Sequence, residues 1–319
     1  MRQFSLRQLR YLQALAHTGH FGRAAQACHV TQPALSMQVR QLEDMLGVEL
    51  FERLPGRVTL THTGREVLRR AEEILTRSQD LMDFARHARG ILVGELKLGI
   101  IPTIGPYLLP HILDRTARHY PELTLRLRET QTATLTAELS DGRLDAVLAA
   151  LPVAAGEFEE MALFEDRFLL AVPTCHRLAG PGVAELAAVE GERLLLLEEG
   201  HCFRDQALSY CAQVDPSMIA GFGATSFATI LQMVASDYGV TLIPEMAVKS
   251  EAHGRKEIAV LRFAEPEPRR TIGLVWRKSS PRRTDYSALG GLITDIARDN
   301  GWKRLTAEAD STGIEAASD

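Results

Sequence analysis

The sequence predicts a chain of three parts: a winged helix-turn-helix, a long helix and an α/β body. Three observations support this prediction. The 319 residues exceed the length of one ordinary domain. The first 90 residues show helical periodicity followed by a short hairpin, whereas strands and helices alternate after Gly90. The composition, 45% hydrophobic and 24% charged, is typical of a globular protein whose core needs neither disulfides nor a structural metal.

The N-terminal residues predict three helices and a β-hairpin. Apolar residues recur at helical spacing over 4–16, and a short second helix fits 22–27. A third helix begins with Thr31 as its N-cap and ends at Gly47. Two short helices with a tight connection form a helix-turn-helix. Residues 50–61 predict two short strands around a Pro-Gly turn, which makes a wing beside the helices.

Residues 63–89 predict one long helix, because they contain no proline and a single glycine near the start. Apolar residues recur every seven positions in two series: Val67, Ile74, Leu81 and Ala88, and Leu68, Leu75 and Met82. Such a stripe must be buried against a partner. Packing against the same chain would satisfy it, but we expect no other helix of the first 90 residues to cover it. We therefore predict a homodimer formed through residues 63–90.

Beyond Gly90 the alternation of strands and helices favours a parallel sheet with helices on both faces. The expected strands are 95–101, 123–129, 146–151, 168–172, 239–243 and 271–277, and the expected helices are 108–119, 134–140 and 286–300. Residues 304–319, which are rich in small, polar and acidic residues, predict a disordered tail.

Charge divides the chain into a basic head and an acidic remainder. Residues 1–90 hold 13 arginines and 9 acids, whereas residues 91–319 hold 23 basic and 32 acidic residues. This asymmetry indicates nucleic acid at the N-terminal end, although chance variation explains it equally well. The sequence shows neither a membrane span nor a signal peptide, so we expect a cytoplasmic, nucleoid-associated protein with no membrane partner. Its four cysteines are then reduced by default: Cys28, Cys175, Cys202 and Cys211.

The chain resembles LysR-type transcriptional regulators. In the head, the resemblance rests on Ala24-Ala25, Thr31-Gln32-Pro33-Ala34-Leu35-Ser36, Gln41-Leu42-Glu43, Leu46-Gly47-Val48-Glu49-Leu50-Phe51-Glu52-Arg53, Leu60-Thr61 and Thr63-Gly64. Within that family, segments 101–110, 200–211 and 266–275 resemble the OxyR subfamily of peroxide sensors. The resemblance covers roughly residues 3–300.

This resemblance implies a domain organisation and partners. The body is expected to consist of two Rossmann-like subdomains of the periplasmic-binding-protein type. The implied parts are a winged helix-turn-helix DNA-binding domain at 1–62, a linker and dimerisation helix at 63–90, and a regulatory body at 91–303, with subdomain I at about 91–165 plus 268–303 and subdomain II at about 166–267. Two dimers are expected to form a homotetramer on promoter DNA, with RNA polymerase as a further partner.

The second helix of a helix-turn-helix places its N-terminal side chains at base edges in the major groove. The residues that we expect at this surface are Thr31, Gln32, Pro33, Ser36 and Arg40, with Arg53 and Arg57 flanking the wing turn. Amide, hydroxyl and guanidinium groups can bind bases or phosphates, and a proline can contact a thymine methyl group. The alternative is a plain three-helix core with solvated polar residues. Cys28 lies where packing expects a small apolar residue and should be an inert thiol.

Cys202 lies in surroundings that suit a reactive thiolate. It is predicted near a helix N-terminus, with His201 before it and Arg204 after it, and both features favour the anion. Such a thiolate can attack a peroxide oxygen. A zinc site is the alternative, but it would need distant loops to bring together Cys175, His176, His201, Cys202 and Cys211. We therefore expect neither a metal nor a cofactor.

The resemblance also implies the groups around this thiol. Hydrogen-bond donors for the peroxide would be Thr103 and Thr132, joined by His201 and Asp205, with Arg270 nearby. Cys202 would form a disulfide with Cys211 and activate oxidative-stress genes. From the sequence alone the two threonines read as ordinary loop or N-cap residues. Gly221 and Gly223 depart from the subfamily, which often has His and Arg at these places.

Two other functions stay open at this point. One is a LysR-type regulator that senses a small metabolite in the cleft between its subdomains. The other is a thiol peroxidase, an enzyme that would need a regenerating reductant and would leave the DNA-binding head unexplained. We expect a regulator rather than an enzyme, with hydrogen peroxide as its signal.

Overall fold

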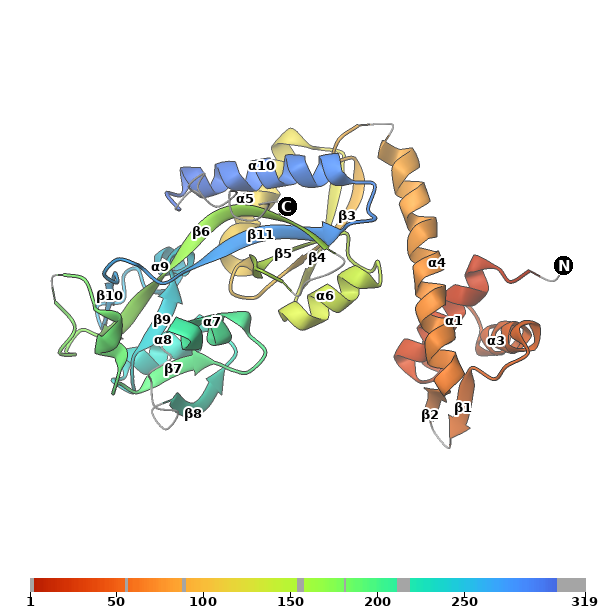
Figure 1. Ribbon diagram of the computed structural model, residues 1–319, viewed down its shortest axis with the longest axis horizontal. Helices are drawn as coiled ribbons and strands as arrows, with labels where there is room; N and C mark the ends of the chain where they lie inside the picture. The colour runs from red at the N-terminus through yellow and green to blue at the C-terminus, as the bar shows by residue number, and fades with distance from the viewer. Residues whose placement is uncertain are drawn as a thin grey trace, which may run out of the picture. The chain divides into compact units, whose positions relative to one another are not determined.

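The computed structural model describes residues 3–54, 57–87, 90–153, 158–180, 182–210 and 219–302. The chain forms two compact units, residues 1–88 and 89–319, which are considered separately (Figure 1). The described helices include no candidate for a membrane-spanning segment.

The first unit, the head, contains the predicted helix-turn-helix and wing. Its described elements are α1 (Leu6–Thr18), α2 (Phe21–Ala27), α3 (Gln32–Leu46), β1 (Phe51–Leu54), β2 (Arg57–Leu60) and α4 (His62–His87). Ser5 and Gln8 close the start of α1 with a reciprocal capping box. Gly19 and Gly47 end α1 and α3 in the left-handed conformation, at φ +59° and +71°. The Pro-Gly turn at 55–56 lies outside the described residues.

The head has its own core, formed where α1, α2 and α3 meet. Leu12, Leu15, Leu35 and Leu42 are completely buried there. Cys28 is half-buried against this core, and burial raises the pKa of its thiol. This environment fits the expectation of an unreactive cysteine.

The expectation that no helix of the head covers α4 is wrong for its first half. There α1 packs against α4, and Val67, Leu68 and Leu75 contact the head core. Sequence periodicity identifies a stripe but does not say which neighbour covers each part of it. Three residues of the stripe, Ile74, Leu81 and Met82, remain exposed, and so does the nearby Phe84. Ala88 lies outside the described residues.

The second unit, the body, is built on a seven-stranded mixed sheet in the order β10-β6-β11-β5-β3-β4, with β9 joined to β6. Strands β7 and β8 form a separate pair. The elements are β3 (Gly94–Ile100), α5 (Gly105–His119), β4 (Leu123–Glu129), α6 (Thr132–Ser140), β5 (Ala146–Leu151), β6 (Phe158–Pro173), β7 (Leu194–Leu197), α7 (Cys202–Tyr210), β8 (Ile219–Ala224), α8 (Phe227–Ala235), β9 (Thr241–Pro244), α9 (Glu245–Glu251), β10 (Ile258–Leu261), β11 (Arg269–Arg277) and α10 (Arg283–Asp299).

The prediction of a parallel sheet is only partly correct. Strand β3 is parallel to β4 and β5, but β11 inserts between β5 and β6 and runs antiparallel to both. Alternation along the sequence reports the order of elements and not the direction of a strand that returns from the far end of the chain. The centre of the sheet is therefore antiparallel.

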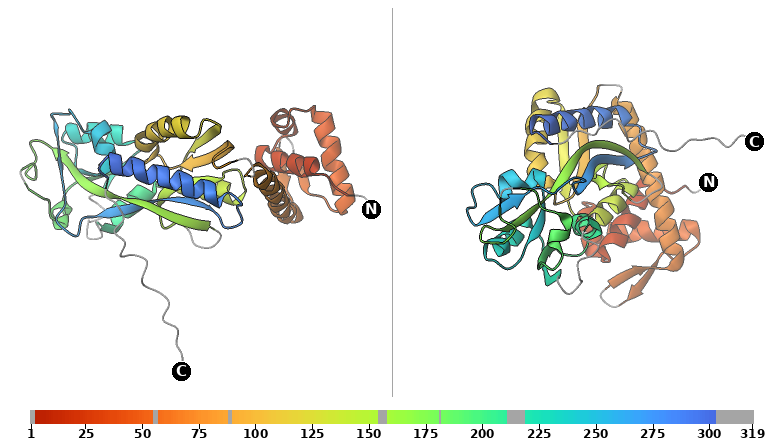
Figure 2. Two further views of the ribbon diagram at one scale, coloured as in Figure 1. Left: turned by 90° about the horizontal axis from the view of Figure 1, so that it is seen from above. Right: turned by 60° about the vertical axis from the view of Figure 1, so that its left-hand side comes forward.

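Strand β6 is longer than the expected strand 168–172 and changes partners along its length. Residues 158–167 pair with β11, and residues 168–173 pair with β9 and β10. Figure 2 shows this strand extending along the body beneath α10. Helix α10 packs against β6 and α5, whereas α6 packs against β5 and β11 (Figure 1). Strand β6 therefore connects β11 to β9 and β10, and β6 and β11 are called the hinge strands below.

Candidate functional site

Cys202 is the first residue of α7, which confirms its predicted place at a helix N-terminus. The preceding turn requires glycine at position 200, because φ is +92° and an added Cβ would lie 2.6 Å from Oε1 of Gln131. The Cys202 thiol is half-buried and contacts the body core. The unpaired N–H groups of the first turn of α7 favour a negative charge at this position.

His201 and Arg204, which flank Cys202 in the sequence, each contact a residue at the end of β7 or in the turn between β7 and α7. His201 is buried, and its Nε2 lies 3.9 Å from the Glu198 carboxylate. Arg204 donates from Nη1 to the carbonyl oxygen of Leu197, 3.0 Å away. Its guanidinium thus fixes the turn between β7 and α7.

Arg270 in β11 is the centre of a buried polar group on the hinge strands. Its Nε donates to Asp166 Oδ2 at 3.0 Å, and both side chains of this ion pair are almost completely buried. The Met246 N–H also donates to Asp166, at 3.2 Å. Burial raises the pKa of Asp166, while the charge of Arg270 and the Met246 N–H oppose the shift. The pair holds β6, β11 and the start of α9 together.

The same arginine fixes Thr103, which is buried between β3 and α5. Nη1 donates to Thr103 Oγ1 at 2.8 Å, and Nη2 donates to the Thr103 carbonyl oxygen at 3.0 Å. A guanidinium has donors only, so the Thr103 hydroxyl must accept from Arg270. The proton of the hydroxyl is therefore available for another acceptor.

Arg270 also reaches α7. Its guanidinium carbon lies 5.1 Å from the centre of the Phe203 ring, and Phe203 is the residue after Cys202. Phe203 is buried against the rings of Phe168 and Phe227. A single arginine thus links Thr103 to the first turn of the helix that begins at Cys202.

Thr132 is the first residue of α6. The neighbouring Gln131 donates from Nε2 to the Glu199 carbonyl oxygen at 3.3 Å, so α6 begins against the turn that leads to Cys202. The Thr132 Oγ1 is buried, and no described group forms a hydrogen bond with it. The same is true of Gln206 Oε1, one helical turn after Cys202. A buried hydroxyl of this kind is ready to bind a small polar molecule.

Some expected members of the site are not brought in. The Asp205 side chain is exposed on α7, and Cys211 lies outside the described residues. Cys175 is exposed, and His176 binds Glu192 at 3.2 Å. Within the described part of the chain, no metal-binding group contains the proposed zinc ligands Cys175, His176, His201 and Cys202.

Asp166, which anchors Arg270, was missed in the sequence. The alternation of side chains along a strand could have identified it. Side chains two apart share a face, and Asp166 stands between the buried Phe164 and Phe168. Phe203 and Gln131 also contact the site, but they read as ordinary core and surface residues.

The residues of α3 that we expect to contact DNA are accessible on the head. Leu35, Val39 and Leu42 bury one side of α3, and the residues that are exposed or half-exposed at its start are Thr31, Gln32, Pro33, Ser36 and Arg40. Thr31 occupies the N-cap position, but its side chain makes no cap hydrogen bond. Arg57 is exposed at the start of β2, whereas the side chain of Arg53 lies outside the described residues.

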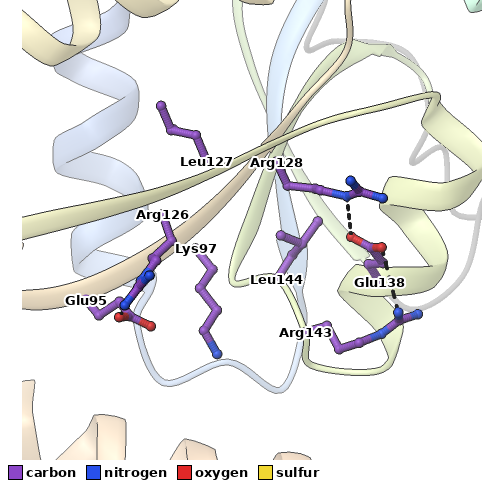
Figure 3. Close-up of a pocket in the computed structure, with 8 residues that line it drawn as sticks. All are labelled: Glu95, Lys97, Arg126, Leu127, Arg128, Glu138, Arg143 and Leu144. Atoms are coloured by element: carbon purple, nitrogen blue, oxygen red, sulfur yellow. Dashed lines mark hydrogen bonds and ion pairs between the residues drawn. The ribbon is translucent and has the colours of Figure 1, made fainter. Parts of the chain in front are cut away.

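A hollow of about 470 Å³ lies on the surface of the sheet, lined by Glu95, Lys97, Arg126, Leu127, Arg128, Glu138, Arg143 and Leu144. Figure 3 shows Arg128 and Arg143 both directed toward Glu138. Arg126 binds Glu95 at 2.9 Å. The acids neutralise much of the basic lining, and the hollow lies along β3 and β4, away from Thr103.

The head and the body each match a family model. Residues 6–65 match the bacterial regulatory helix-turn-helix of the lysR family, and residues 89–297 match the LysR substrate binding domain. The chain belongs to the LysR family. Its members combine a DNA-binding helix-turn-helix with a regulatory body, and this confirms both the resemblance and the fold class predicted from the sequence.

Relatives and solved structures confirm the similarity to the OxyR subfamily. The transcriptional dual regulator OxyR of Escherichia coli K12 is 43% identical over 289 residues, which cover 91% of this chain and 94% of that protein. A hydrogen peroxide-inducible genes activator of Haemophilus influenzae is 38% identical, covering 91% and 96%. A full-length OxyR variant from Pseudomonas aeruginosa matches with TM-score 0.77 and 37% identity, covering 92% and 95%. A peroxide-bound OxyR variant from Corynebacterium glutamicum matches with TM-score 0.64 and 33% identity, covering 97% and 99%.

Proposed function

We propose that this LysR-family chain is a transcription regulator that binds double-stranded promoter DNA through its head and senses hydrogen peroxide through Cys202. One observation above all supports the proposal: a half-buried thiol begins a helix, and the turn before it binds Gln131, the residue that precedes Thr132, whose buried hydroxyl no described group satisfies. The names of the relatives, which are peroxide-inducible activators, agree with it. The protein would act in the cytoplasm, at the nucleoid.

The first chemical step is oxidation of Cys202. The thiolate sulfur attacks one oxygen of hydrogen peroxide, the O–O bond breaks, and the leaving hydroxide takes a proton to become water. Cys202 is left as a sulfenic acid. Negative charge grows on the departing oxygen, so donors placed around it lower the barrier. In this proposal the donors are the hydroxyls of Thr103 and Thr132 together with His201, and Arg270 positions Thr103. In this proposal Asp205, which is exposed, exchanges protons with solvent.

The second step is a disulfide between Cys202 and Cys211. The Cys211 thiolate attacks the sulfenic sulfur, the S–O bond breaks, and the leaving hydroxide takes a proton to become water. Helix α7 opposes this step, because eight residues at ~1.5 Å place the Cα of Tyr210 about 12 Å from that of Cys202. The next Cα of any chain follows at ~3.8 Å, whereas a disulfide needs Cα atoms about 4.4–6.8 Å apart. We infer that α7 must unwind before the bond closes.

The segment that we expect to change on oxidation begins at α7 and extends into β8. Strand β8 pairs with β7 in parallel and contains Gly221 and Gly223. Glycine offers no side chain to stabilise an unwound α7. The proposal therefore includes an oxidised state that lacks the side-chain contacts which His and Arg give at these places in the subfamily.

Oligomerisation would carry the change to the DNA. The exposed apolar residues of α4 form the surface that we assign to the homodimer: Ile74, Leu81, Met82 and Phe84. A homotetramer then presents four heads, and a new packing of the body alters the spacing at which they meet the promoter and RNA polymerase.

A footprint on promoter DNA, with and without peroxide, tests this function. The proposal predicts that peroxide changes the protected region with the wild-type chain and leaves it unchanged with Cys202→Ser. A footprint that follows a small metabolite and ignores Cys202→Ser would establish a metabolite-sensing regulator instead. Catalytic consumption of peroxide with a thiol reductant, and no response on DNA, would establish a thiol peroxidase.

A further inference from the structure

Helix α3, which we expect to enter the major groove, carries an apolar side chain at the centre of its exposed face. Met37 lies four residues after Pro33 and three before Arg40, so the three share one face of the helix. The opposite face is buried through Leu35 and Val39. Met37 is therefore on the surface that the helix-turn-helix presents to DNA.

The exposure of Met37 is unusual for this unit. Its side chain is 55% exposed, more than any other large apolar residue in the described head outside α4. It is not one of the residues that form the head core. An unbranched thioether is flexible enough to fit an irregular apolar surface.

The neighbours of Met37 favour nucleic acid as the surface that covers it. Arg40, on the same face, is exposed and can bind a phosphate. Asp44 lies one turn further along this face and repels phosphates, so the N-terminal half of α3 is the part that enters the groove. Pro33 and Met37 then form an apolar strip along that half.

We propose that Met37 selects thymine in the binding site by contact with its C5-methyl group. Methionine has no hydrogen-bond donor and only a weak acceptor, so it cannot read the polar edges of the bases. The thymine methyl is the apolar group that the major groove displays, and it distinguishes A·T pairs from the others. This inference rests on the proposed DNA binding by the head. It goes further in naming the base that Met37 recognises.

The test starts from a DNA site selected from a random duplex pool by the full-length chain. Each thymine of that site is then replaced in turn by uracil, which removes only the methyl group. Affinities are measured at one fixed salt concentration. At one position of each half-site, loss of the methyl should weaken wild-type binding about four-fold, the equivalent of one buried methyl group.

The same replacements are measured with variants of α3. Met37→Leu should retain the penalty for uracil, whereas Met37→Ala should bind the thymine and uracil sites equally. Leu46→Ala is the matched control, because Leu46 is also an exposed apolar residue of α3 but lies at its far end, on another side of the helix. This control should retain the full penalty.

Two results overturn the inference, and they can be told apart. If uracil is tolerated everywhere by the wild type, or its penalty survives in Met37→Ala, DNA binding stands and the role of Met37 is wrong. If the full-length chain selects no site at all, DNA reading by the head is wrong and the inference falls with it. Circular dichroism of each variant confirms that the head is folded.

Discussion

The two sides of the proposed peroxide site differ in how firmly they are held. On the hinge side, Thr103, Asp166 and Arg270 are buried and bound to one another across two strands and a loop. On the α7 side, Cys202 begins a nine-residue helix, and the buried Oγ1 of Thr132 and Oε1 of Gln206 have no partner among the described groups.

This difference assigns different tasks to the two sides. A fully bonded, buried network has one arrangement, so it can hold a donor in place before the reaction begins. A short helix is marginal on its own and depends on a few tertiary contacts, so it can unwind at modest cost. In the proposed mechanism, the fixed side prepares the chemistry, and the loose side converts it into a change of shape.

The largest expected effect removes the reacting atom. Cys202→Ser should abolish peroxide-dependent labelling by dimedone, because a serine hydroxyl does not form a sulfenic acid. The exposed Cys175 provides the control, and Cys175→Ser should react like the wild type. Labelling is measured by mass spectrometry in the Cys211→Ser background. Label on Cys175 rather than Cys202 would place the sensor elsewhere.

The firmness of the hinge side can be tested by breaking its ion pair. Asp166→Asn leaves the Arg270 charge buried without a counter-charge and should lower the free energy of unfolding by about 3–5 kcal/mol. On the α7 side, Glu198→Gln disrupts only a long contact to His201, with Glu198 44% exposed, and should change it by less than about 1 kcal/mol. Urea denaturation of the reduced protein measures both. Similar losses would remove the distinction between the two sides.

The donors of the site should affect the rate of sulfenic acid formation, and loss of the Thr103 hydroxyl should also lower stability because it leaves a buried Arg270 N–H unpaired. Thr103→Val preserves shape and removes the hydroxyl, and should slow sulfenic acid formation by about 10²-fold, as for loss of one oxyanion donor. Thr132→Val should act in the same direction. The control is Thr136→Val, because that hydroxyl donates to the Thr132 carbonyl within α6, at 3.0 Å. A wild-type rate in Thr103→Val would exclude the hinge side from the chemistry.

The smallest effect concerns the far end of α7. Tyr210 donates from its hydroxyl to the Arg269 carbonyl oxygen at 2.8 Å, and this bond fixes the helix to β11. Tyr210→Phe should ease unwinding by about 1 kcal/mol and speed disulfide formation about five-fold. The rate of sulfenic acid formation should not change. In Tyr238→Phe, a substitution of another partly exposed tyrosine, both rates should stay at the wild-type value. Slower disulfide formation in Tyr210→Phe would mean that the bond helps the switch.

The fold could be predicted where local patterns decide it. Strands β4 and β5 have the expected bounds, and α4 begins and ends within two residues of the expected helix, since caps and periodicity are local signals. The length of β6 was missed because its first half, Phe158 to Arg167, is rich in acids and shows little of the apolar pattern used to recognise strands. The antiparallel centre depends on β11, which pairs with strands more than 100 residues away, and no local pattern reports such a pairing.

The candidate site likewise has one part that local sequence patterns predict and another that they do not. The place of Cys202 at a helix start follows from the glycine turn before it and from the helical pattern after it. The bond between Arg270 and Thr103 joins residues 167 positions apart, so the sequence alone could not show that the arginine orients the threonine. The resemblance to the subfamily named both residues, but the physical link between them, and Asp166 behind it, came from the structure.

The central claim is that α7 unwinds when Cys202 is oxidised while the hinge strands stay in place. Hydrogen–deuterium exchange of the full-length protein, reduced and after stoichiometric peroxide, tests it directly. We predict that the amides of residues 203–210 exchange much faster after oxidation, whereas those of β6 and β11 keep their protection. A Cys202–Cys211 disulfide, verified by mass spectrometry, in a protein whose α7 amides remain as protected as in the reduced state would contradict the account.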